Sequence, residues 1–103
     1  MEVGIDLVKK DRFNNLESNF INRVYTKEEL DLYSSLSGNK RIDFLASRWA
    51  VKEAIFKALG NKDYLHYAIL NNEKGKPFIL NHPEIKVSIS HDGDYVIAIV
   101  IVE

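Results

Sequence analysis

The sequence contains no cysteine, which excludes a disulfide framework, a thiolate metal site and a cysteine nucleophile, and which agrees with a reducing compartment. It also has no run of about 20 apolar residues that could cross a membrane. The first residues, Met1–Asp6, lack the basic stretch and long apolar core of a secretory signal. We therefore expect a cytoplasmic protein with no membrane partner.

A surplus of either charge is missing as well, since 14 basic and 15 acidic residues give a formal net charge of −1. Bulk electrostatics thus give no reason to expect nucleic acid as a partner. The 103 residues have the usual size of one domain, and no linker, internal repeat or low-complexity segment divides them. We expect a single domain spanning residues 1–103.

Hydrophobic periodicity predicts a strand first and helices next. Apolar and β-branched residues predict an opening strand over Val3–Val8 that places Asp6 at or near its end. The spacing of apolar residues over 9–22 predicts one short helix. Thr26-Lys27-Glu28-Glu29 is a capping box, which predicts a helix start at Thr26. The principal helix is predicted over Arg41–Leu59, where Gly60 ends it.

The remainder of the chain reads as strands over 64–70, 78–80, 85–90 and 95–102, with turns at 74–77 and at Asp92-Gly93. This order predicts an α+β fold, with an antiparallel sheet packed on one long helix and one or two shorter helices. The last strand, 95–102, is apolar without alternation, so we expect both of its faces to be covered. The second cover is either another copy of the chain, which we favour, or the chain's own elements.

Between Phe44 and Gly60, four charged residues interrupt the otherwise apolar principal helix: Arg48, Lys52, Glu53 and Lys57. A charge on a buried helix needs a partner or a ligand, so these residues either form structural pairs at the edge of the core or bind something. If the first strand packs on this helix, Asp6 and Glu53 meet as two carboxylates suited to Mg²⁺, with Lys57 beside them. Taken alone, Asp6 could equally cap a turn or helix, and His91 could be a plain surface histidine or a donor to phosphate.

Two motifs carry a family resemblance: Gly4-Ile5-Asp6 near the start, and Trp49-Ala50-Val51-Lys52-Glu53-Ala54-Ile55-Phe56-Lys57 on the principal helix. Together they resemble the 4′-phosphopantetheinyl transferases. The short bacterial branch, the holo-[acyl-carrier-protein] synthases, is similar in five further elements, which here are Arg12, Arg23–Leu30, Phe44–Arg48, Gly75–Pro77 and Ser88–His91.

The resemblance implies a Mg²⁺-dependent transfer of the 4′-phosphopantetheine arm of coenzyme A to a serine of apo acyl carrier protein, a step of fatty acid biosynthesis that releases adenosine 3′,5′-bisphosphate. It implies that Asp6 and Glu53 hold the metal, Mg²⁺ or Mn²⁺, and that Lys57 contacts the pyrophosphate as the third catalytic residue. The serine comes from the partner protein. Its proton goes to Glu53 or to a water on the metal, and we favour the water.

The resemblance further implies that Arg48 and His91 contact the phosphates of coenzyme A. Gly75, Lys76 and Pro77 are predicted to border the nucleotide, and Ser90 is a further predicted contact to coenzyme A. Because the carrier protein is acidic, Arg12 and Arg23 are predicted to contact it. Lys9 and Lys10 either join them or belong to a solvated surface.

The resemblance to the short branch also implies a homotrimer with a site at each subunit boundary. The sequence leaves open whether His91 acts within its own subunit or in a neighbouring one. One departure from the family is a shortened segment after Gly60. Two other classes of protein stay open, a non-catalytic module that binds a nucleotide or an acidic partner, and a structural oligomer built on the last strand.

Overall fold

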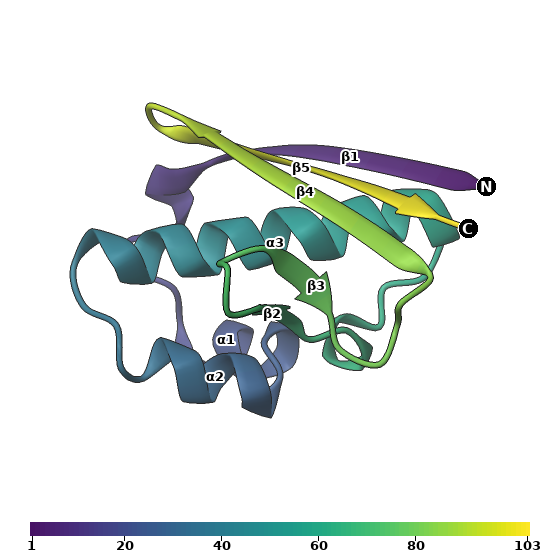
Figure 1. Cartoon of the computed structure of the whole chain (residues 1–103). Coiled ribbons are helices and arrows are strands. Elements are labelled where there is room, and N and C mark those ends of the chain that lie inside the picture. The colour runs from purple at the N-terminus through teal and green to yellow at the C-terminus, as the bar shows by residue number, and fades with distance from the viewer.

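Helix α3, Asn39–Leu59, lies at the centre of the molecule, between two layers (Figure 1). The computed structural model describes all residues, 1–103. One layer is an antiparallel sheet of order β1-β5-β4, formed by Glu2–Lys9, Tyr95–Val102 and Ile85–Asp92. The other holds α1 (Ser18–Val24), α2 (Lys27–Tyr33) and the two-stranded sheet of β2 (Ile69–Asn71) and β3 (Pro77–Ile79). This arrangement confirms the predicted α+β class.

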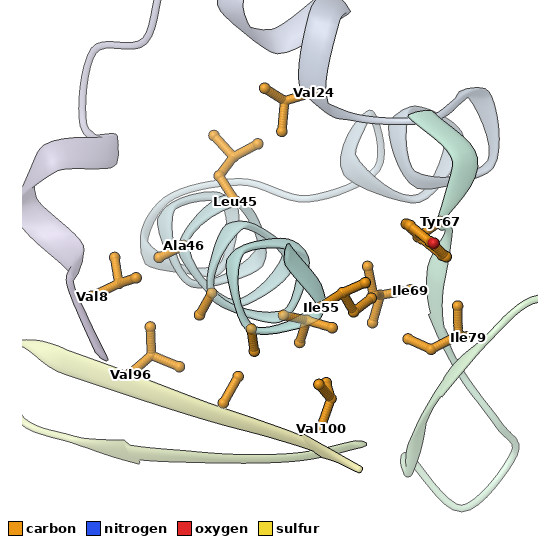
Figure 2. Close-up of a cluster of buried hydrophobic side chains, with 14 of the residues drawn as sticks. Val8, Val24, Leu45, Ala46, Ile55, Tyr67, Ile69, Ile79, Val96 and Val100 are labelled. Atoms are coloured by element: carbon orange, nitrogen blue, oxygen red, sulfur yellow. The ribbon is translucent and has the colours of Figure 1, made fainter. Parts of the chain in front are cut away.

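Burial on all sides explains the composition of α3. Between Phe44 and Ile55 its small and branched residues pack on the sheet and on the opposite layer (Figure 2), so that apolar side chains predominate there, and Ser47, Arg48 and Lys52 are buried among them. The helix begins at Asn39, two residues before the predicted start, and ends at Gly60, which has a left-handed φ of 79°.

Strand β1 packs directly against α3, and Gly4 permits this contact. A Cβ atom at Gly4 would lie 1.8 Å from the carbonyl oxygen of Ala54, so no other residue fits there without moving the strand. Side chains alternate along a strand, so Asp6 faces α3 as Gly4 does. The strand predicted over Val3–Val8 is confirmed and extends one residue farther at each end, so that Asp6 lies three residues before Lys9, which pairs with Tyr95 of β5.

The prediction of a single helix over 9–22 was wrong. Pairing with β5 extends β1 to Lys9, and a 3₁₀ turn, η1 (Lys10–Phe13), follows and buries Phe13 in the core. Helix α1 begins only at Ser18. The capping box at Thr26 is confirmed, since the Thr26 hydroxyl and the Glu29 carboxylate each accept a hydrogen bond from the other residue's backbone N–H.

The strand predicted over 64–70 is in part a 3₁₀ turn, η2 (Tyr64–His66), and β2 begins only at Ile69. The cause is the buried Lys52, whose Nζ donates to the carbonyl oxygens of Tyr64 at 2.7 Å and Tyr67 at 2.6 Å. Two carbonyls turned toward one ammonium group require a curled backbone rather than an extended one. Strand β5 has its predicted bounds, and residues 93–94 form the tight turn before it.

The outer face of the three-stranded sheet is apolar on β1 and β5, and it is polar on β4, which places Lys86, Ser88 and Ser90 there. Strands β1 and β5 place six aliphatic side chains there, Val3, Ile5, Leu7, Ile97, Ile99 and Ile101, which oppose one another in register. Leu7 is 61% exposed and Ile99 is 37% exposed, whereas Val96, Ala98 and Val100 on the inner face are fully buried. This chain therefore covers one face of β5 and leaves the other uncovered.

No helix of the chain combines the length and the apolar character needed to span a membrane.

Candidate active site

The structure brings Asp6, Glu53 and Lys57 together where β1 crosses the second half of α3. The ammonium group of Lys57 donates to Asp6 Oδ1 at 3.1 Å. Burial, and next the charge of Asp6, raise the pKa of Glu53. Two carboxylates from distant parts of the sequence thus share one place, as the motifs predicted.

Three cations surround these two carboxylates. Lys62, Lys57 and Arg12, in that order of effect, oppose the rise in the pKa of Glu53. Arg12 lies on η1, directly after β1. Lys62 lies in the shortened segment after α3, with its Nζ 4.7 Å from the centre of the Phe56 ring. Sequence reasoning missed Lys62, because its proximity to Glu53 depends on how the chain turns at Gly60.

The donor set at this place fits a hard divalent cation. The chain has no group of three or more His, Cys, Asp or Glu side chains that could hold a metal ion. Mg²⁺ needs no such cage, since proteins usually bind it through one or two carboxylates and leave its other positions to water and substrate phosphates. Asp6 and Glu53 would hold such an ion.

A second polar site lies on the other side of α3, around His91. An open pocket of 380 Å³ has six polar lining residues, Lys10, Lys40, Asp43, Ser47, Arg48 and His91. Burial and the nearby charge of Lys10 lower the pKa of His91, while Asp43 opposes them. With four basic side chains and one carboxylate, the pocket is suited to an anion.

Arg48 is mostly committed to contacts within the chain. Its guanidinium group donates to the carbonyl oxygen of Ile69 at 3.2 Å and to Asn71 Oδ1, and it stacks on the Phe44 ring at 4.1 Å. Only 6% of Arg48 is exposed. Arg48 therefore offers a phosphate only a residual donor edge and its charge, not a free guanidinium group.

The two polar sites face away from each other across α3. An α-helix turns about 100° per residue, so Arg48 and Lys57 project about 180° apart. In the sheet, β5 lies between the strand that carries Asp6 and the strand that carries His91. Asp6 and His91 therefore belong to two separate polar sites of one subunit.

The Gly75–Pro77 turn is connected to Arg48. Asn71 accepts from Arg48 through Oδ1 and donates through Nδ2 to the carbonyl oxygen of Gly75 at 3.0 Å. Lys76 and Pro77 line a hollow of 570 Å³ that also contains Phe78, which is 38% exposed. An exposed ring beside a lysine is suited to a nucleotide.

The other predicted contact residues lie apart. Ser90 is on the outer face of the sheet, opposite Ile97, and points away from the His91 pocket. Arg23 is exposed in the last turn of α1 and forms no ion pair. Lys10 pairs with Asp43 at 3.1 Å, whereas Lys9 makes only an exposed pair with Asp11 at 3.7 Å.

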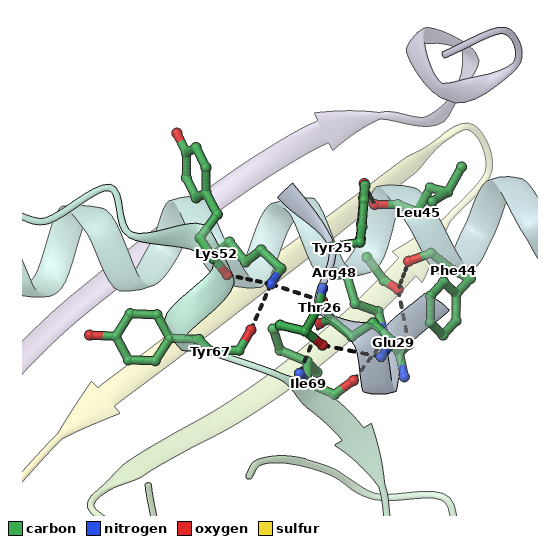
Figure 3. Close-up of polar contacts among 11 residues, drawn as sticks. Tyr25, Thr26, Glu29, Phe44, Leu45, Arg48, Lys52, Tyr67 and Ile69 are labelled. Atoms are coloured by element: carbon green, nitrogen blue, oxygen red, sulfur yellow. Dashed lines mark hydrogen bonds and ion pairs between the residues drawn. The ribbon is translucent and has the colours of Figure 1, made fainter. Parts of the chain in front are cut away.

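A buried ion pair, Glu29 with Lys52 at 2.9 Å, holds the helical layer to α3 (Figure 3). Glu29 also accepts hydrogen bonds from the backbone N–H groups of Thr26 and Ile69, each at 2.9 Å. Burial lowers the pKa of Lys52, and Glu29 opposes this. The capping box gave Glu29 a role from the sequence, but its partners at Lys52 and Ile69 depend on tertiary packing.

Comparison with known sequences gives one consistent family. Residues 2–100 match the family described as the 4′-phosphopantetheinyl transferase superfamily. A holo-[acyl-carrier-protein] synthase of Geobacillus sp. (strain WCH70) is 39% identical over 112 residues, which cover 98% of this chain and 94% of the relative. A holo-[acyl-carrier-protein] synthase of Streptococcus thermophilus is 42% identical, covering 97% of this chain and 92% of the relative.

Solved structures agree with this result. The holo-(acyl-carrier-protein) synthase of Bacillus anthracis, in complex with CoA (3′,5′-ADP), superposes with a TM-score of 0.88 at 30% identity, over 98% of this chain and 94% of the other. The Helicobacter pylori enzyme, in complex with coenzyme A, gives a TM-score of 0.80 at 28% identity, over 98% of this chain and 99% of the other.

Proposed function

The chain belongs to the 4′-phosphopantetheinyl transferase superfamily, and from this premise we propose that it transfers the 4′-phosphopantetheine arm of coenzyme A to a serine of apo acyl carrier protein. Adenosine 3′,5′-bisphosphate is the second product. The observation that carries the proposal is the meeting of Asp6, Glu53 and Lys57 at one place. The relatives named as holo-[acyl-carrier-protein] synthases, and their complexes with coenzyme A, support it.

The chemistry requires neutralisation of negative charge at a diphosphate. When the serine oxygen attacks the phosphorus that carries the pantetheine arm, the bond to the bridging oxygen breaks and charge develops on the leaving phosphate. Lys57 would place an ammonium group beside this phosphate. Asp6 and Glu53 would hold Mg²⁺, or Mn²⁺ in its place, which supplies further positive charge. The chain needs no nucleophile because the partner provides it.

The pocket around His91 is the proposed site for the terminal 3′-phosphate. Its basic residues favour an anion, and the neutral imidazole expected from the lowered pKa of His91 can take up a proton when a phosphate binds. The hollow beside Lys76 and Pro77 is the proposed border of the nucleotide. We keep Ser90 as a proposed contact that coenzyme A reaches from the outer face of the sheet.

We also propose that the enzyme is a homotrimer in which each site combines two subunits. The bare aliphatic face of β1 and β5 is the proposed subunit contact, since burying it removes apolar area from water. Because Asp6 and His91 belong to separate polar sites of one subunit, we propose that one coenzyme A contacts Asp6 of one subunit and His91 of another. Sedimentation of the Ile99→Asp variant tests this, with a smaller species expected than for the wild type.

Arg12 and Arg23 are the proposed contacts to the acidic carrier protein. The charge of Arg12 lowers the pKa of Glu53, so Arg12 lies near the two carboxylates, where the serine must react. Arg12→Glu and Arg23→Glu should raise the KM for carrier protein far more than the KM for coenzyme A. Equal increases in both KM values would contradict this placement.

The deciding experiment is intact-mass measurement of apo acyl carrier protein after incubation with the enzyme, coenzyme A and Mg²⁺. An increase by the mass of the arm is expected, and Glu53→Gln should slow it by about a hundredfold or more. Glu73→Gln, at an exposed position of the β2–β3 turn, is the matched control. No increase at high enzyme concentration would instead favour a non-catalytic binding module.

A further inference from the structure

The segment that follows α3 is held at both ends. Gly60, in its left-handed conformation, turns the chain sharply at the end of the helix. Lys52 then binds the carbonyl oxygens of Tyr64 and Tyr67, and Asn61 Nδ2 donates to the Tyr67 hydroxyl at 3.2 Å. The ring of Tyr64 packs on Trp49, with 5.3 Å between ring centres. The short stretch that contains Lys62 therefore has little freedom to move away from α3.

Lys62 is a cation without an anionic partner in this chain. Its ammonium group lies over the Phe56 ring and within reach of no carboxylate for an ion pair, whereas Lys57 is paired with Asp6. A lysine held on an aromatic face keeps its charge and loses part of its hydration. Of the three cations that lower the pKa of Glu53, Lys62 has the largest effect.

The balance of charge around Asp6 and Glu53 points to an anionic ligand. Lys57, Lys62 and Arg12 each act on Glu53, and of the three only Lys57 is already paired with a carboxylate, that of Asp6. Two carboxylates alone would need no third cation, and a surplus cation beside a metal site is suited to the phosphates that complete the metal's coordination.

We propose that Lys62 is a substrate-binding residue of the transfer site, and that its ammonium group contacts the diphosphate of coenzyme A alongside Lys57. The inference rests on the proposed function and adds a residue that lies outside both motifs of the resemblance. The short stretch between Gly60 and Tyr64 holds this lysine over Phe56, three residues beyond Glu53 on α3.

Calorimetric titration with coenzyme A tests the contact without relying on turnover. Lys62→Ala should bind coenzyme A about tenfold more weakly, the usual loss for one hydrogen bond to a charged group. Lys62→Arg should recover most of the affinity, because the guanidinium group keeps the charge and stacks on Phe56. Lys27→Ala removes an exposed lysine of α2 and should bind as the wild type does. The Lys62→Ala substitution should weaken the binding of adenosine 3′,5′-bisphosphate less than the binding of coenzyme A, because this nucleotide lacks half of the diphosphate.

Steady-state kinetics distinguish this role from a structural one and from contact with the carrier protein. The Lys62→Ala variant should raise the KM for coenzyme A about tenfold, leave the KM for carrier protein unchanged and melt within a few degrees of the wild type. A raised KM for carrier protein alone, or unchanged coenzyme A affinity, would overturn the proposal. If the wild type binds coenzyme A but transfers no arm, the proposed function fails, while the titration still decides whether Lys62 contacts the diphosphate.

Discussion

His91 shows how a single side chain depends on its neighbours. Its position at the end of β4 leaves it partly open to solvent, yet burial and Lys10 lower its pKa. The lowered pKa favours the neutral imidazole in the free protein. A bound phosphate would reverse this effect, because an adjacent anion favours the charged ring.

Replacing Lys10 by Met should raise the pKa of His91, since a repelling charge is removed and Asp43 loses its ion-pair partner. The lowered pKa of His91 also makes the stability of the protein depend on pH. Protonation opposes the native state, so the free energy of unfolding should decrease as the pH falls below about 6.5. Titration of the His91 ring by NMR in both proteins measures the change, with Lys27→Ala as the control. A pKa of His91 that is equal in all three proteins would contradict the assignment of Lys10.

At the scale of elements, the closest packing in the molecule is that of β1 on α3. Gly4 is part of the first motif because the strand must approach the Ala54 carbonyl, and the same approach brings Asp6 to Glu53. The motif thus combines a steric condition with a chemical one.

Substitution of Gly4 by Ala should destabilise the protein by more than about 3 kcal/mol, because the added methyl group would meet backbone rather than a flexible side chain. Transfer activity should fall further than the loss of folded protein explains, since β1 carries Asp6 away from α3. Thermal unfolding and activity per folded molecule test this, with Glu2→Ala on the same strand as control. A Gly4→Ala variant as stable as the wild type would show that β1 can shift freely.

The buried Glu29–Lys52 ion pair joins α2, and with it the layer that faces away from the three-stranded sheet, to α3. Lys52→Met leaves the Glu29 carboxylate buried without its ion partner, which should cost about 3–5 kcal/mol of unfolding free energy. Adding Glu29→Gln should recover part of this loss, because no buried charge then remains. Urea unfolding at one fixed protein concentration measures both variants. If Lys52→Met unfolds at the wild-type urea concentration, the pair does not hold the layers together.

The sequence predicted the elements whose signals are local. The capping box at Thr26, the glycine stop at Gly60 and the continuous apolar run of β5 are each read from a few neighbouring residues. The proximity of Asp6 and Glu53 was predicted on the condition that the first strand packs on the principal helix, which it does. The partners of Lys52 escaped prediction, as did Lys62, because they lie in segments brought close only by folding, and the carbonyls that Lys52 binds turned a predicted strand into η2.

At the scale of the whole molecule, the two polar sites on opposite sides of α3 make a test of the proposed assembly. Asp6→Asn and His91→Ala variants should each transfer slowly at low coenzyme A. Subunits of the two variants, mixed by refolding together, should recover activity, because some boundaries then combine an intact Asp6 with an intact His91.

The control for this experiment is each variant refolded alone, at the same total concentration. Recovery in the mixture requires that the two residues act across a boundary. A mixture no more active than the average of its parents would place Asp6 and His91 in separate functions or within one subunit.

The bare aliphatic face of β1 and β5 has a consequence for how catalytic output scales with the amount of protein. If every working site needs surfaces from two copies, turnover per chain declines on dilution below the dissociation constant of the assembly, although each chain stays intact. The cell's expression level would then set both how many catalysts exist and what fraction of them is competent.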